Sequence, residues 1–206
     1  VARIEAQFRA ATADLPEDKL HLIRGPRASD SGMAEASRFF DVTLVGLMGE
    51  GSPSTGLHPD RIALMSGRPV LAFPKGADTT RLADHAMLAW DGSRAAARAL
   101  HASLRLLETG TRVTVVTVGE PKKTEVEADG LDPKTALERQ GLTADWITVP
   151  QGRGGIARTL LHHASVLGAG LLVMGAFEHS KFREDIFGGV THDVMAQTRV
   201  PVFLAH

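Results

Sequence analysis

The final 37 residues, 170–206, constrain the fold of this chain more than any other segment. They begin with an unbroken apolar run from Leu171 to Met174, which is what a parallel strand covered on both faces requires. Gly175 ends this run, a loop and a short helical pattern follow, and the strand pattern RVPVFLAH closes the segment. This order predicts two parallel strands joined by a right-handed crossover, as in α/β proteins.

The same alternation extends back to residue 85. Strand patterns at 85–90, 112–118 and 145–150 alternate with helical patterns, the last of which covers 155–168. Together with the final segment they make five strands and four helices. The sequence therefore predicts a three-layer α/β/α sandwich around an open, parallel, five-stranded sheet.

An earlier part of the chain repeats this pattern. The segment DVTLVG, which ends at Gly46, is similar to GLLVMG, which ends at Gly175. RPVLAFP and RVPVFLAH form a second similar pair, with Pro69 and Pro201 near their starts. The two glycines are 129 residues apart and the two prolines 132, so the copies differ by three residues in a loop. Such self-similarity predicts two tandem copies of one fold.

The first copy lacks part of the pattern. With the 129-residue offset, Val1 aligns near Gly130, so counterparts of the first strand, first helix and second strand are missing from these 206 residues. We therefore expect residues 1–74 to form an incomplete repeat, residues 75–84 a polar linker, and residues 85–206 a complete domain. The sequence starts inside an amphipathic helical pattern, and we expect it to be part of a longer protein.

The closing segment resembles that of the universal stress protein family. Nucleotide-binding members carry a glycine, two residues, a glycine, nine residues, and then Gly-Ser or Gly-Thr. Here Gly175 and Gly188 match the first and third glycines, whereas Glu178 replaces the second and Gly189 replaces the Ser or Thr. The resemblance implies an adenine nucleotide α-hydrolase-like fold with two tandem repeats.

The resemblance also implies a ligand site in the crevice where the strand order reverses. Asp91 would contact the adenine or ribose, and the main chain near Thr117 and Val118 would contact the base. The phosphates would lie among Gly175, Gly188, Gly189 and Val190. The alternative is that Asp91-Gly92-Ser93 is only a turn and helix cap, and that the glycines only permit a positive φ.

Glu178 is the main departure from the family motif. A carboxylate at this position would repel a triphosphate, at a cost of ~1 kcal/mol at 4 Å in water and ~4 kcal/mol at an effective dielectric constant of 20. Lys181 and Arg183 lie nearby in the sequence and could offset this charge. We therefore expect weak binding of ATP, with AMP or adenosine losing less affinity relative to ATP than in a fully matching member.

The final strands carry a further prediction. Proline has no N–H to donate, so Pro69 and Pro201 suit edge strands or strand starts. The resemblance implies that these strands pair across a two-fold axis, either between two domains of one chain or in a homodimer. We expect them to be adjacent and antiparallel; the alternative is a solvent-facing edge that proline protects from further pairing.

Composition and motifs exclude several classes of function. The net charge of −1 and the hydrophobic content of 43% indicate neither disorder nor nucleic-acid binding. No apolar run approaches the length of a membrane span, and no signal-peptide pattern is present, which is compatible with the cytoplasm. The sequence contains no cysteine, its nine histidines lack metal-ligand spacing, and it carries no dinucleotide or flavin fingerprint.

Three functions remain. The first is a module that senses or sequesters an adenine nucleotide, ATP or AMP, during stress adaptation. The second is a slow ATPase or autophosphorylating protein in which Asp91 orients the nucleotide. The third is a ligand-free interaction scaffold with degenerate pockets. A conventional enzyme is disfavoured, because the sequence shows no activated nucleophile, metal cage or paired carboxylates.

Overall fold

The structure is a computed structural model that describes residues 2–21, 29–47, 56–120, 128–176 and 189–206. Its helices are α1 (Ala2–Ala11), α2 (Asp30–Ser37), α3 (Pro59–Ser66), α4 (Arg94–Ser103), α5 (Pro133–Glu138), α6 (Gly155–Val166) and α7 (Val190–Gln197), with a short 3-10 helix at Glu17–Lys19. Its strands are β1 (Thr43–Gly46), β2 (Val70–Phe73), β3 (His85–Ala89), β4 (Arg112–Val118), β5 (Thr143–Val149), β6 (Leu171–Gly175) and β7 (Val202–Ala205).

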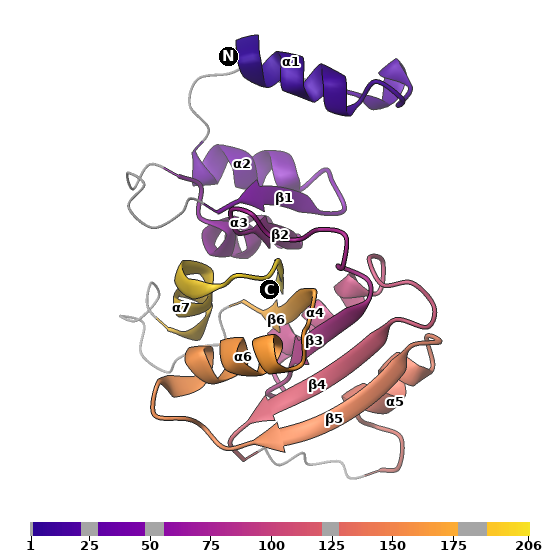
Figure 1. The fold of residues 1–206 in the computed structure, drawn as a ribbon, viewed down its shortest axis with the longest axis vertical. Coiled ribbons are helices and arrows are strands. Elements are labelled where there is room, and N and C mark those ends of the chain that lie inside the picture. The colour runs from indigo at the N-terminus through magenta and orange to yellow at the C-terminus, as the bar shows by residue number, and fades with distance from the viewer. Residues whose placement is uncertain (1, 22–28, 48–55, 121–127, 177–188) are drawn as a thin grey trace.

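These strands form one sheet in the order β1-β2-β7-β6-β3-β4-β5 (Figure 1). The five strands of residues 85–206 are all parallel, which confirms the predicted parallel sheet. One core lies between the sheet and α2, α3, α6 and α7, and the other lies between the sheet and α4 and α5. The result is the predicted three-layer sandwich. The sheet has seven strands rather than five, because β1 and β2 extend it beyond β7.

The junction between β2 and β7 is antiparallel, as predicted for the two final strands. Leu71 lies opposite Phe203, with Val70 opposite Leu204 and Ala72 opposite Val202. Leu71 and Phe203 are 132 residues apart, which is also the spacing between Pro69 and Pro201. Leu71 and Phe203, which are equivalent at this offset, therefore face each other on an approximate two-fold axis, and the pairs on either side of them are related by this axis. Both strands have neighbours on both sides, so the alternative of a solvent-facing edge is wrong.

Each copy contains the same hydrogen bonds beside this junction. The N–H of Thr43 donates to the carbonyl of Pro69 at 3.0 Å, and the N–H of Leu172 donates to the carbonyl of Pro201 at 2.9 Å. Each proline precedes its strand and contributes only an acceptor. The sheet therefore loses no hydrogen bond at these positions, although proline has no N–H to donate.

The first copy ends in an open strand edge. In the second copy β6 pairs with β7 on one side and β3 on the other, whereas β1 pairs, among the described strands, with β2 alone. Leu44 of β1 is 64% exposed, while Val173, its counterpart at the 129-residue offset, is 1% exposed. That the first copy lacks the strand equivalent to β3 stays a prediction. Turns at 74–84 connect β2 to β3, and the domain limits 1–74, 75–84 and 85–206 stay predictions.

His85 is a buried histidine at the start of the central strand β3. Its Nδ1 lies 3.1 Å from the Leu167 carbonyl oxygen and its Nε2 lies 2.9 Å from Thr114 Oγ1. Because a carbonyl can only accept, Nδ1 donates to Leu167 and Nε2 accepts from the Thr114 hydroxyl. Burial lowers the pKa of His85, with the Leu167 hydrogen bond opposing this effect and Arg112 adding to it.

A lowered pKa predicts loss of stability in mild acid. The unfolded chain takes up the proton near its ordinary pKa of 6.5, whereas the folded chain resists protonation. The contribution of His85 to stability is therefore complete above this value and declines as the pH falls below it. Urea unfolding at about pH 7.5 and about pH 5.5 should show a smaller decline for His85→Gln than for the wild type. The control is His101→Gln, because His101 is exposed on α4, and this variant should decline as much as the wild type. Equal declines in the wild type and His85→Gln would contradict the prediction.

Candidate functional site

The strand order reverses between β3 and β6. From β3 the chain proceeds through β4 to β5 on one side, and from β6 it proceeds to β7 on the other. β3 and β6 are parallel neighbours, with Leu88 opposite Val173, so the loops that follow them leave from the same end of the sheet. Asp91 and Gly175 stand at the starts of these two loops. This is the topological switch point at which open α/β sheets bind ligands.

The loop after β3 is a turn that leads directly into α4. Asp91 Oδ1 accepts a hydrogen bond from the Ser93 N–H at 3.0 Å, and Gly92 between them has φ of 77°. Ser93 Oγ then accepts from the Ala96 N–H at 3.0 Å and caps the helix. The turn-and-cap role is therefore present. Asp91 itself is exposed at the switch point, where its carboxylate can also meet a ligand.

Gly175 has a role that its position in the motif did not reveal. A Cβ atom at this residue would lie 2.6 Å from the carbonyl carbon of Ala95 and 2.7 Å from the nitrogen of Ala96. The first turn of α4 therefore packs directly on the backbone of β6, and only glycine leaves room for it. The alternative of a positive φ is wrong for Gly175, because close packing, not backbone conformation, requires this glycine.

Gly189 and Val190 begin α7 after the loop that follows β6. Gly189 has φ of 131° and occupies the N-cap position without a side-chain hydrogen bond. Side chains rarely adopt this conformation, so the serine or threonine of the family motif would be strained here. Val190 is partly buried and packs against the core that lies between the sheet and helices α6 and α7. Gly188 and Glu178 lie outside the described residues.

Thr117 and Val118 stand at the end of β4, which pairs with β3. The side chain of Thr117 is buried, and its Oγ1 accepts a hydrogen bond from Trp146 Nε1 at 3.0 Å. Val118 packs partly buried on the opposite face of the sheet. The family resemblance assigned main-chain contacts to this position, which the local packing permits. Sequence reasoning missed the role of Trp146, although an indole N–H on a strand requires a partner when it is partly buried.

In the first copy a side-chain pair occupies the place equivalent to this site. His58 is the N-cap of α3, as Gly189 is of α7. Asp30 Oδ1 accepts from the His58 N–H at 2.9 Å, and Asp30 Oδ2 lies 2.9 Å from His58 Nδ1. Arg61 also lies 3.8 Å from Asp30 Oδ2. A carboxylate bound to the helix start opposes the approach of a phosphate, and no motif in the sequence indicated this pair.

The described residues show neither a metal-binding cluster nor a membrane-spanning helix. Among these residues no group of three or more His, Asp or Glu side chains could hold a metal ion. In the same ranges none of the helices combines the length and the apolar character that a membrane crossing needs.

The Universal stress protein family profile matches residues 83–206, which is more than half of the chain. These residues contain the five parallel strands and the crevice between β3 and β6. The chain belongs to the universal stress protein family. Comparison with curated protein sequences gives no match.

One solved structure with a TM-score above 0.5 shows the same fold. A universal stress protein from Archaeoglobus fulgidus DSM 4304 is 20% identical with a TM-score of 0.65, over 84% of this chain and 63% of that one. This chain thus spans 63% of that protein's length. Hypothetical protein MJ0577 (18% identity, TM-score 0.49) and a universal stress protein in complex with cAMP (19%, 0.43) each align with 60% of this chain and with 96% and 97% of their own.

The packing at Gly175 predicts an asymmetric response of the two copies to the same substitution. Gly175→Ala should lower the free energy of unfolding by about 1–3 kcal/mol, because the new methyl group overlaps the backbone of α4. Gly46 is its counterpart, and a Cβ there would have no atom of the described residues within 4 Å. Gly46→Ala should therefore be neutral or stabilising by up to about 1 kcal/mol. Chemical denaturation of both variants tests this, and equal losses would contradict it.

Proposed function

We propose that residues 85–206 bind an adenine nucleotide, ATP or AMP, weakly in the crevice between β3 and β6. The observation that carries the proposal is the switch point itself, where the loops of Asp91 and Gly175 leave the same end of the sheet. Membership of the universal stress protein family supports the choice of ligand. In this arrangement the adenosine lies toward Asp91 and the backbone of Thr117 and Val118.

The phosphates extend toward the start of α7. Gly188, Gly189 and Val190 supply backbone N–H groups there, and the first turn of a helix favours a negative charge. The absence of a hydroxyl at Gly189 removes one donor but leaves its N–H. Glu178 adds a like charge on this side, at a cost of ~1–4 kcal/mol, so the triphosphate loses more affinity than the adenosine.

The proposed role is sensing or sequestration during stress adaptation in the cytoplasm. The crevice holds the nucleotide through a carboxylate at one end and backbone groups at the other. Sensing or sequestration at such a site does not require rapid turnover of the nucleotide. The first copy differs, because the Asp30–His58 pair stands at the start of α3. One nucleotide per chain is therefore the proposed stoichiometry.

Calorimetric titration tests the charge at Glu178. ATP should bind Glu178→Gly at least about tenfold more tightly than the wild type, equivalent to ~1.4 kcal/mol, whereas AMP should gain less. Glu108→Gly is the matched control, because Glu108 is an exposed loop carboxylate outside the helices and strands and should leave affinity unchanged. Tight ATP binding by the wild type, or no gain in Glu178→Gly, would mean that Glu178 points away from the phosphates.

The effect of a nucleotide on the stability of the protein distinguishes a binding module from a ligand-free scaffold. A nucleotide at about 100 times its Kd should add ~2.7 kcal/mol to the free energy of unfolding. Asp91→Ala should reduce this gain. If neither ATP nor AMP at millimolar concentration raises the stability of the wild type or of Glu178→Gly, the scaffold replaces the nucleotide-binding function.

A further inference from the structure

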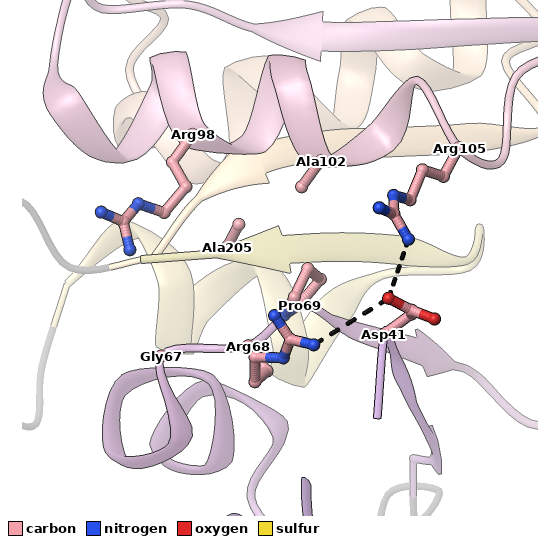
Figure 2. Close-up of a pocket in the computed structure, with 8 residues that line it drawn as sticks. All are labelled: Asp41, Gly67, Arg68, Pro69, Arg98, Ala102, Arg105 and Ala205. Carbon is pink, nitrogen blue, oxygen red and sulfur yellow. Dashed lines mark hydrogen bonds and ion pairs between the residues drawn. The ribbon is translucent and has the colours of Figure 1, made fainter. Parts of the chain in front are cut away.

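A second pocket lies at the junction of the two copies, away from the residues assigned to the nucleotide. Figure 2 shows it beneath α4, with a volume of about 310 Å³. Arg98 and Ala102 of α4 and Arg105 of the following turn line one side. Asp41, before β1, and Arg68, before β2, line the other side. The antiparallel pairing of β2 and β7 brings these two sides together.

The pocket carries an excess of positive charge. Three arginines face one carboxylate, so the formal charge of its lining is 3 − 1 = +2. Asp41 Oδ1 lies 2.8 Å from Arg105 and 3.9 Å from Arg68. Within the part of the chain that the structure describes, no ion pair or hydrogen bond of Arg98 is found, and in Figure 2 no dashed line joins it to the other lining residues. The lining therefore lacks about two negative charges.

The arginines border the pocket from both copies, with Arg98 at one end and Arg68 and Arg105 beside Asp41 at the other (Figure 2). Nε of Arg68 donates to the Phe40 carbonyl at 2.8 Å, which anchors its guanidinium beside the strand junction. Arg98 and Arg105 are seven residues apart on α4 and its extension, about two helical turns, so they lie on the same side of it. Guanidinium groups are planar donors that bind phosphate oxygens in pairs.

We propose that this pocket binds a small dianion of the phosphate class, a phosphate monoester, held between Arg98 and Arg105 of one copy and Arg68 of the other. A dianion supplies the two charges that the lining lacks. The pocket has room for a phosphate with a small organic group attached. Since the ligand contacts both copies, it stabilises their junction. Asp41 competes with the ligand, because it already pairs with two of the three arginines.

Inorganic phosphate is the probe, titrated into the whole chain at constant ionic strength with chloride as the replaced anion. Phosphate should raise the midpoint of thermal unfolding more than chloride does. Arg98→Gln should weaken phosphate binding by about threefold to tenfold, a range that allows for the solvent exposure of the site. Asp41→Asn should strengthen it by about threefold, because it frees Arg105 and Arg68.

Arg112→Gln is the control, because Arg112 is, like Arg98, an exposed arginine, but it pairs with Asp145 and lies outside the pocket. It should bind phosphate as the wild type does. The proposal is overturned if phosphate acts no differently from chloride, if Arg98→Gln retains wild-type affinity, or if Asp41→Asn binds more weakly. Arg98→Gln should leave the binding of adenosine, which carries no phosphate, unchanged, because Arg98 lies outside the residues assigned to the nucleotide, so the two proposals can fail independently.

Discussion

The antiparallel pairing of β2 with β7 is the interaction on which the rest of the structure depends. All four residues of β7 are buried, and its backbone groups need partners on both sides. β6 supplies one side and β2 the other, which joins the two copies in one continuous sheet. The orientation of the first copy follows from this pairing. The pairing also places Arg68 opposite α4 and so creates the arginine-lined pocket at the junction.

The two copies share a topology but differ in their sites. In the second copy Gly175 lets α4 pack against the backbone of β6, which places the turn at Asp91 beside the start of the loop that leads to α7. In the first copy no described helix covers β1 in this way, Gly46 has open space around it, and Asp30 binds the start of α3. The switch point between β3 and β6 therefore belongs to the second copy, while Asp30 binds the helix start at the equivalent place in the first.

Much of the fold could be predicted from residue patterns. The β-branched run at 112–118 and the apolar run at 171–174 located β4 and β6 within one residue, because β-branched residues favour strands and a strand covered on both faces is apolar. The proline spacing also indicated which strands would face each other. By contrast, β5 begins two residues earlier than expected and has exposed positions along it, so its alternating pattern marks the strand less sharply.

The sequence by itself determined the layer order and the repeat, because these depend on local periodicity and on the chirality of the crossovers. The strand order that brings the loops of Asp91 and Gly175 to one switch point was implied by the family resemblance. Only the tertiary structure decided why Gly175 must be glycine, that Asp30 pairs with His58, and that Arg68 faces Arg98 and Arg105. Each of these depends on a contact between segments far apart in the chain. Such contacts follow from how helices and strands pack, and no local pattern of residues encodes them.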